Sequence, residues 1–566
     1  MAVKILFVDV PAIQLDHLEK AIESGVSPSY AYGFPLGILY LSSYIKKQHP
    51  DTETALVDYP SRLSQITDYK SVTQFISEIA RESASFEPDV IAFSAIFSSC
   101  HPFLMRCVEL IKEIWPNAVS ILGGMHPSNL ARKMLEHKDI DYVAKGEGEL
   151  SFAKFVGEFQ SEEREKIKGI YSQKSSELII GELLNADFID DLDEIPLPDW
   201  DLMDMEYFVS EGARSQVRVG SAELDKKTAI IMTTRGCPFR CTFCSSHSVH
   251  GRKMRYRSVE NVIQEVSILY EKFGVTRFVP EDDLFTAHKT RVVALLGALR
   301  ALKIPDFEIQ FPNALSPMVL SKTVMDALVD SGMKLATISV DSGSVYTQKY
   351  IVDRRTDLTR TREVIDYLKN NGIIVRCNFI IGFPGETLEL MQETIDYAKS
   401  IAVDWVHIGM AMPLVGSQMY QDFVDRGDIE DNEKFWSVCD FDRRSFDTQE
   451  ISAKDLMELT YRANLDINFI HNPNLKSGNY ARVDELFTDV VSKHPFHIFG
   501  WYALKQAHKK RNNLIEENET QRKIIKLIKT NSRSKKLYNK YGDLLPAEFT
   551  ALLSHDVEMK MAHYAS

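Results

Sequence analysis

Short apolar runs alternate with helix-length amphipathic segments over the first 150 residues. The pattern predicts strands at residues 3–7, 54–57, 90–94, 120–122 and 142–144. Strands that alternate with helical segments are typical of a doubly wound parallel sheet, so we predict an α/β, Rossmann-like domain over residues 1–150. Ligands of such sheets bind at the carboxyl ends of the strands, and turn-forming residues follow the predicted strands there.

A second alternating series begins near residue 228. Its apolar runs predict strands at residues 228–234, 276–281, 307–311, 335–341, 373–381 and 404–410. Six successive strand-helix units indicate a partial (β/α)6 barrel, which we place at residues 226–425. The less regular segment before it, with an acidic, proline-bearing stretch, predicts a linker region at residues 151–225. After the barrel the strand pattern stops, and periodic apolar positions predict a helical C-terminal domain at residues 426–566.

Length and charge narrow the classes of function. A chain of 566 residues is too long for one hydrophobic core, which agrees with several domains. The formal net charge of -14 argues against an extended phosphate-binding surface, so we expect no nucleic-acid partner. No apolar run reaches the roughly 18 residues of a membrane helix, and the first residues lack a signal-peptide core. We therefore expect a cytoplasmic protein without a membrane span.

Cysteine spacing points to a metal site. The chain has seven cysteines, too few for a disulfide scaffold, and three of them lie within eight residues: Cys237, Cys241 and Cys244. Three thiolates on one loop can hold a four-iron cluster and leave one iron open to a small chelating molecule. An alternative interpretation is a structural zinc site in which His247 supplies the fourth ligand.

This spacing, with the aromatic Phe243 before the last cysteine, resembles the signature of the radical S-adenosylmethionine superfamily. The resemblance continues in the acidic turn 281–283, in the Asp-Ser-Gly segment 341–343, where the family usually has Glu first, and in the Gly-Phe-Pro-Gly-Glu-Thr turn 382–387. Each segment alone also fits a plain role, a helix cap or a turn. The resemblance implies S-adenosylmethionine contacts at Phe243, Glu281, Asp282, Asp283, Asp341, Ser342, Arg376, Asn378 and Gly382.

Residues 1–150 resemble the cobalamin-binding domain that precedes the barrel in one large group of that superfamily. The matching segments are Ser-Ala-Ile 94–96, Gly-Gly-Met-His 123–126 and Gly-Glu-Gly-Glu 146–149. Glycines suit such a site, because a corrin's nucleotide tail needs close backbone approach. The resemblance implies cobalamin contacts at Pro11, Ser94, Ile96, Gly123, Gly124, His126, Gly146 and Glu147.

The front segment also departs from the common cobalamin pattern. Many cobalamin domains ligate cobalt with a histidine in Asp-x-His-x-x-Gly, but residues 9–14 here are Asp-Val-Pro-Ala-Ile-Gln. The resemblance then implies a corrinoid whose lower face has no protein ligand. Two alternatives stay open: a Rossmann-like domain that binds nothing or a nucleotide, and a purely structural His126.

The resemblance as a whole implies a cobalamin-dependent radical S-adenosylmethionine C-methyltransferase. Such an enzyme moves a methyl group from methylcobalamin to an unactivated carbon of a small molecule through a 5'-deoxyadenosyl radical. It implies a [4Fe-4S] cluster, S-adenosylmethionine and cobalamin as cofactors, and a flavodoxin or ferredoxin as electron donor. The same motifs fit a non-methylating cyclase or rearrangement enzyme, and a zinc-stabilised binding protein is the remaining alternative. No residue is singled out as catalytic.

Overall fold

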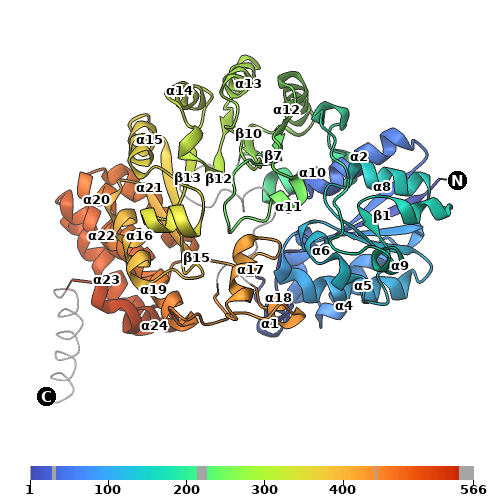
Figure 1. The fold of residues 1–566 in the computed structure, drawn as a ribbon. Coiled ribbons are helices and arrows are strands. Elements are labelled where there is room, and N and C mark those ends of the chain that lie inside the picture. Colours follow the sequence, from blue (N-terminus) through green and yellow to red (C-terminus); the bar gives the residue numbers. More distant parts are fainter. Residues whose placement is uncertain (1, 29–33, 213–225, 440–442, 547–566) are drawn as a thin grey trace.

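The computed structural model describes residues 2–28, 34–212, 226–439 and 443–546. These residues form three regions. An α/β front domain, a barrel and a C-terminal group of helices follow one another across the molecule (Figure 1). This arrangement confirms the predicted fold class. Residues 213–225 of the predicted linker and 547–566 of the predicted helical domain lie outside the described residues.

The front domain is a six-stranded sheet in the order β2-β1-β3-β4-β5-β6. Its first five strands are parallel, and all five match the predicted positions: β1 (Lys4–Asp9), β2 (Glu53–Asp58), β3 (Val90–Ser94), β4 (Val119–Gly123) and β5 (Tyr142–Ala144). The order of the strands reverses between β1 and β3, and the crevice at such a switch point is where doubly wound sheets bind ligands.

Helices cover both faces of this sheet because their apolar positions repeat at helical spacing. In α4 the buried positions include Val72, Phe75, Ile76 and Ile79, the spacing of one helical face. The helices of the front domain include α1 (Leu15–Ser24), α2 (Leu36–Gln48), α4 (Val72–Arg81), α5 (His101–Ile114), α6 (Met125–Asn129), α7 (Ala131–Met134) and α8 (Glu149–Gly157).

The front sheet continues beyond residue 150. Strand β6 (Ile170–Tyr171) pairs antiparallel with β5, so part of the predicted linker forms the edge of this sheet. Helix α8 crosses the predicted boundary and packs against α2. A two-residue strand carries almost no periodic signal, which is why the pattern of residues alone missed it.

The barrel is built from the six predicted strand regions in chain order. They are β7 (Thr228–Ile231), β10 (Arg277–Pro280), β11 with β12 (Glu308–Ile309, Phe311–Leu315), β13 (Leu335–Asp341), β14 (Ile374–Ile381) and β15 (Trp405–Met410). All barrel pairings are parallel, in the orders β11-β10-β7 and β12-β13-β14-β15. The outer layer includes α12 (Val259–Phe273), α13 (Lys289–Ala301), α14 (Lys322–Asp330), α15 (Leu358–Asn370) and α16 (Leu388–Ser400). Helix α17 (Gln418–Asp425) follows β15 and packs its buried residues into the apolar core of the front domain.

Two asparagines cover the open edge of the barrel at β15. Asn464 accepts from Ile408 N at 3.0 Å and donates to Ile408 O at 2.8 Å, and Asn468 pairs with Val406 in the same way at 2.8 Å. A side-chain amide carries one donor and one acceptor, so each asparagine substitutes for a neighbouring strand. The edge strand of a sheet otherwise presents unpaired backbone groups.

The C-terminal region is helical, as predicted for residues after the barrel. Its elements include α18 (Glu433–Ser437), α19 (Ala453–Leu465), α20 (Pro473–Ser477), α21 (Tyr480–Lys493), α22 (Ile498–Lys510), α23 (Leu514–Thr530) and α24 (Ser532–Tyr541). Helices α21 to α24 form a small core of their own around Phe487 and Phe499. Among the described residues, no helix is long and apolar enough to cross a membrane.

Candidate active site

The three clustered cysteines lie on the loop that follows the first barrel strand. We call residues 236–246 the cluster loop. A short ladder between β8 (Thr234–Arg235) and β9 (Arg255–Tyr256) closes the base of this loop. Gly236 starts the loop at φ +87°, and a Cβ atom there would lie 2.4 Å from the carbonyl oxygen of Lys253. Only glycine therefore permits the chain to turn toward Cys237.

Two carboxylates at the end of β10 hold this part of the barrel together. Asp282 accepts hydrogen bonds from the backbone N–H groups of Thr233 and Thr234, at 2.5 and 2.9 Å, and from the Thr233 hydroxyl at 2.6 Å. Asp283 accepts from Gly236 N at 3.1 Å and from Ser246 Oγ at 2.5 Å. It thus joins the residue before Cys237 to a residue just after Cys244.

An arginine that the sequence analysis did not single out lies beside the cysteines. Arg354 Nη1 is 3.8 Å from Cys241 Sγ and 2.9 Å from Asp341 Oδ2. Burial raises the pKa of all three thiols, that of Cys241 to about 12, and the charge of Arg354 opposes this shift. Arg354 follows β13 in an irregular stretch, and no periodicity in the sequence marks it.

Asp341 has the backbone geometry of a functional turn. It has φ +66°, is buried, and lies where the register between β13 and β14 shifts. Ser339 Oγ donates to its Oδ1 at 2.8 Å. Non-glycine residues at positive φ cost conformational energy and cluster at functional sites. Asp341, which the resemblance assigned to S-adenosylmethionine, also forms an ion pair with Arg354.

Alternate residues of β14 face the hollow of the barrel. Its odd-numbered residues from Val375 to Ile381 are fully buried, whereas Arg376, Asn378 and Ile380 are only half-buried, as the two-residue period of a strand requires. Within the described part of the chain, the buried Oδ1 of Asn378 has no hydrogen-bond partner. Buried polar atoms are normally paired, so this oxygen suits a ligand that donates to it.

Another residue that the sequence analysis missed faces the same side. His407 of β15 is paired in register with Asn378 and is exposed. His407 is a polar residue between the buried Val406 and Ile408, and this break in the apolar run was the available signal.

The remaining predicted S-adenosylmethionine residues lie at the carboxyl ends of β10, β13 and β14 or on the cluster loop. Burial raises the pKa of Glu281 to about 7 and that of Asp282 to about 6. Gly382 has φ +82°, and its turn is held by Glu386, which accepts from Gly382 N at 2.7 Å. Ser342 is buried and hydrogen-bonded to Thr394 at 2.9 Å, and the ring of Phe243 packs against Phe383.

At the carboxyl edge of the front sheet, the predicted cobalamin residues form a backbone turn and an apolar surface. Gly124 has φ +97°, and a Cβ atom there would lie 2.4 Å from Ala95 O, so the turn requires glycine. Ile96 is exposed by 55%, an apolar side chain available to a ligand. Gly123 and Ser94 pair in register at the ends of β4 and β3, and Pro11 follows β1 across the switch point.

His126 is buried and both of its ring nitrogens have partners. Nδ1 lies 3.0 Å from Ser98 Oγ, and Nε2 lies 3.0 Å from His101 Nδ1. Burial, with His101 alongside, lowers the pKa of His126 to about 3. The ring is therefore neutral, and a contact with a corrin would have to replace one of these hydrogen bonds.

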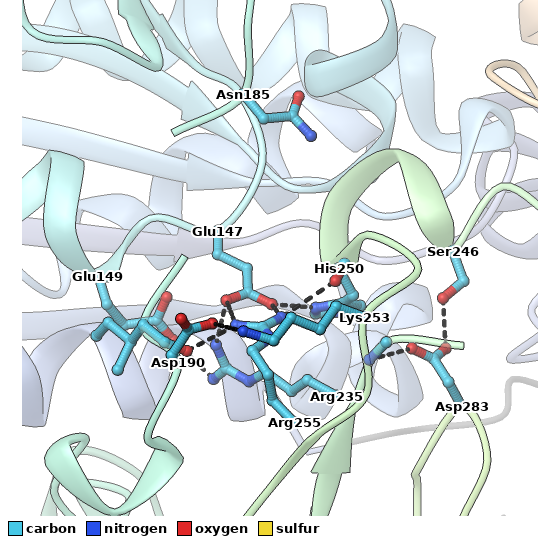
Figure 2. Close-up of polar contacts among 12 residues, drawn as sticks. Glu147, Glu149, Asn185, Asp190, Arg235, Ser246, His250, Lys253, Arg255 and Asp283 are labelled. Carbon is cyan, nitrogen blue, oxygen red and sulfur yellow. Dashed lines mark hydrogen bonds and ion pairs between the residues drawn. The ribbon is translucent and has the colours of Figure 1, made fainter. Parts of the chain in front are cut away.

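Glu147, also predicted to contact cobalamin, faces the barrel instead. Figure 2 shows its carboxylate between Arg235, Arg255 and His250. The distances are 3.2 Å to Arg235 Nη1, 2.5 Å to Arg255 Nη2 and 2.8 Å to His250 Nδ1. Gly146 also lies at this boundary, because a Cβ atom there would meet Asn185 at 2.9 Å.

A cavity of about 890 Å³ opens between the front domain and the barrel. Its wall combines residues of α6 and α7, the cluster loop and the segment after β15; members of these three groups include Asn129, Lys133, Arg240, Cys241, Ser417 and Tyr420. Both domains therefore border one space that includes a cluster-loop cysteine.

His247, the fourth ligand of the zinc alternative, has one ring nitrogen engaged within its own turn. Its Nδ1 lies 3.1 Å from the carbonyl oxygen of Cys244.

Comparison with known proteins agrees with the fold. The radical SAM superfamily profile matches residues 231–398, and the B12 binding domain profile matches residues 25–156. An uncharacterized methyltransferase of Pyrococcus horikoshii is 29% identical over 71% of this chain and 80% of its own length. Cytidylyl-2-hydroxyethylphosphonate methyltransferase of Streptomyces wedmorensis is 26% identical over 72% and 80%.

Two further similarities extend the comparison. Anaerobic magnesium-protoporphyrin IX monomethyl ester cyclase of Rubrivivax gelatinosus is 25% identical over 71% of this chain and 68% of its own. Among solved structures, the radical S-adenosylmethionine methyltransferase TsrM of Kitasatospora setae, with cobalamin and a [4Fe-4S] cluster bound, has the same fold at 16% identity. Its TM-score is 0.56, with coverage of 74% of this chain and 77% of TsrM.

The fold and the two matched domains define a radical S-adenosylmethionine enzyme. More particularly, the chain carries a radical SAM domain together with a B12 binding domain, and it shares the fold of TsrM, a cobalamin-dependent radical S-adenosylmethionine enzyme. Its cofactors are a [4Fe-4S] cluster, S-adenosylmethionine and cobalamin. The residues present fit them: three thiols on one loop, the unpaired Asn378 oxygen in the barrel, and the exposed Ile96 at the front sheet.

Proposed function

We propose that this enzyme is a methyltransferase that transfers a methyl group from cobalamin to an unactivated carbon of a small molecule. The observation that carries the proposal is the 890 Å³ cavity, which both the front domain and the cluster loop line. Apart from Cys241, the residues proposed to contact the cofactors do not line this cavity, so it supports the proposal as the place where the front domain and the cluster loop meet. The similar methyltransferases of Pyrococcus and Streptomyces support the same class of reaction.

In this proposal Cys237, Cys241 and Cys244 ligate three irons of the cluster. When bound, the cluster and its two partner cofactors supply the electron, the hydrogen-abstracting radical and the methyl group. Asp283 fixes the loop, and Arg354 places a positive charge beside Cys241. Glu281, with its pKa near 7, and Asn378 bind the polar end and the ribose side of S-adenosylmethionine.

The front domain is proposed to bind cobalamin at the switch point between β1 and β3. Pro11, Ser94, Ile96, Gly123 and Gly124 lie at this edge, where the turn at Gly124 packs closely against the backbone of Ala95 and Ile96 is exposed. An external one-electron carrier of flavodoxin or ferredoxin type is proposed to reduce the cluster.

The test needs no knowledge of the substrate. Anaerobically reconstituted protein is supplied with cobalamin, reductant and methyl-deuterated S-adenosylmethionine, and both protein-bound cobalamin and small products are analysed by mass spectrometry. A methyltransferase transfers the deuterated methyl group to cobalamin and forms S-adenosylhomocysteine. The absence of both products would contradict the proposal.

A second candidate is a non-methylating cyclase or rearrangement enzyme with the same cofactors. The similarity to the magnesium-protoporphyrin ester cyclase favours it. In the same experiment this candidate predicts 5'-deoxyadenosine without deuterated methyl on cobalamin.

A further inference from the structure

Two carboxylates, one from each domain, border the cluster loop. Asp283 of the barrel binds both ends of the loop from one side. Glu147 of the front domain lies on the other side, among the residues that flank the loop (Figure 2). The loop that carries the three cysteines is therefore held between the two domains.

The contacts of Glu147 form one buried group of charges. We define the Glu147 network as Glu147, Glu149, Arg235, His250 and Arg255. Arg235 bridges the two acids, at 3.2 Å to Glu147 and 2.7 Å to Glu149, and Arg255 makes two hydrogen bonds to Glu147 at 2.8 and 2.5 Å. The side chains of both acids and both arginines are at most 6% exposed.

Because the Glu147 network is buried, its stability depends strongly on each of its residues. Burial raises the pKa of Glu147. The charge of Arg235 and the hydrogen bonds from Arg255 and His250 outweigh this effect and hold the pKa of Glu147 well below its usual range. Glu147 is thus an anion, and together with Glu149 it neutralises the two buried arginines. A buried charge that loses its partner is strongly destabilising, in contrast to a surface ion pair.

The positions of these residues in the sequence connect the Glu147 network to the cluster loop. Arg235 directly precedes Gly236 and Cys237, whereas His250 ends the short helix α11 (His247–His250) after the loop and Arg255 lies in β9. Asn185 adds a further tie, since its amide donates to Ser248 O at 2.7 Å. Glu147 of the front domain and Asn185 of the segment after it therefore contact residues that lie before the first and after the last cysteine of the cluster loop.

We propose that Glu147 is a positioning residue for the iron-sulfur cluster: by docking the front domain onto Arg235, His250 and Arg255, it fixes the cluster loop. The geometry of the cluster site then depends on the docked cobalamin-binding domain, not on the barrel alone. This inference rests on the proposed ligation of the cluster by Cys237, Cys241 and Cys244.

The first measurement uses the full-length protein without any cofactor. Hydrogen exchange of the peptide spanning residues 236–251 is compared between wild type, Glu147→Gln and Lys253→Gln. Lys253 lies between His250 and Arg255 and pairs with Asp190 at 2.7 Å, but its side chain is 70% exposed, so its removal is the matched control. We expect exchange about a hundredfold faster in Glu147→Gln and unchanged in Lys253→Gln.

The second measurement follows iron release from the reconstituted proteins in the presence of an iron chelator. Glu147→Gln should lose iron faster than wild type, while Lys253→Gln keeps it, and Arg255→Lys, which keeps the charge but loses the paired hydrogen bonds, should lie between them. Equal exchange and equal iron retention in Glu147→Gln and wild type would overturn the inference.

Further comparisons keep the outcomes separate. If Glu147→Gln fails to fold, the His250→Gln variant tests the inference in its place. His250 is half-buried, and its substitution removes only one contact of Glu147. Unchanged exchange and iron retention in that variant would then overturn the inference. If wild type binds no cluster, the proposed cysteine ligation fails, whereas the exchange experiment still tests the docking.

Discussion

The rims of the two α/β units in this molecule are built in different ways. At the barrel rim, charged side chains hold every turn near the cysteines: Asp282, Asp283 and Arg354 each bind two or more partners. At the front-sheet rim, the main features are the glycine turn at Gly124 and the exposed Ile96. The barrel rim positions individual polar atoms, whereas the front rim offers backbone and apolar surface, as suits a large planar ligand.

The strongest way to break this comparison is to add one methyl group at Gly236. In Gly236→Ala the new Cβ atom would clash with the carbonyl of Lys253, so the cluster loop should fail to close. We expect loss of the cluster, measured as iron and sulfide per protein after reconstitution. Gly372→Ala is the control, because Gly372 also has a positive φ, +78°, but open space around it. That variant should lose only about 1–2 kcal/mol of stability and keep its cluster.

The matching change at the front rim should affect the other cofactor. Gly124→Ala creates the same 2.4 Å approach, here to Ala95 O, at the end of β4. We expect cobalamin binding to weaken strongly while the iron content stays that of wild type, as measured by equilibrium dialysis with cobalamin and by iron analysis. Loss of iron in this variant, or full retention of cobalamin, would contradict the claim that the front-sheet rim binds cobalamin and the barrel rim binds the cluster.

Charge at the barrel rim should appear in the reduction potential of the cluster. Arg354→Gln removes a positive charge next to Cys241, and a cation there favours the reduced, more negative cluster. We expect a shift of about 59 mV to more negative potential, a tenfold change in the reduction equilibrium, in a titration followed by electron paramagnetic resonance. Arg355→Gln, whose side chain is 72% exposed, should leave the potential unchanged. A positive shift, or equal effects of both variants, would refute a role for Arg354 at the cluster.

The smallest expected effect concerns the pH dependence of S-adenosylmethionine binding. Burial raises the pKa of Glu281 to about 7, so this carboxyl is mostly protonated at pH 6 and mostly ionised at pH 8. An ionised Glu281 accepts hydrogen bonds from the cofactor, and affinity should rise up to about tenfold over this range. Glu281→Gln should flatten the part of the profile due to this group. The affinities are measured by calorimetry on the reconstituted enzymes. Identical pH profiles for wild type and Glu281→Gln would contradict a role for Glu281 in binding S-adenosylmethionine.

Most of the fold followed from the sequence because long buried strands leave a clear pattern. All five parallel strands of the front sheet and the six barrel strand regions lie where alternation of apolar runs and helices predicted them. The missed pieces were β6, β8 and β9, which have two residues each. Elements of that length exist through tertiary pairing, so no local pattern can mark them.

The site was only partly predictable for a related reason. Motifs located the cysteines and the acidic turn, since spacing within one loop is a local property. The partners of Glu147 and of Cys241 are distant in sequence, Arg255 and Arg354 respectively, and only the folded chain brings them together. Glu147 was accordingly predicted to contact cobalamin, whereas the structure gives its carboxylate to the barrel.

The most direct test of the account measures 5'-deoxyadenosine formation from S-adenosylmethionine by the anaerobically reconstituted, reduced enzyme. Wild type is compared with Cys244→Ala and with Cys107→Ala, whose cysteine lies buried in the front domain. The account predicts product from wild type and Cys107→Ala and none from Cys244→Ala. Product formation by Cys244→Ala at the wild-type rate would contradict the claim that the loop after the first barrel strand carries the catalytic cluster.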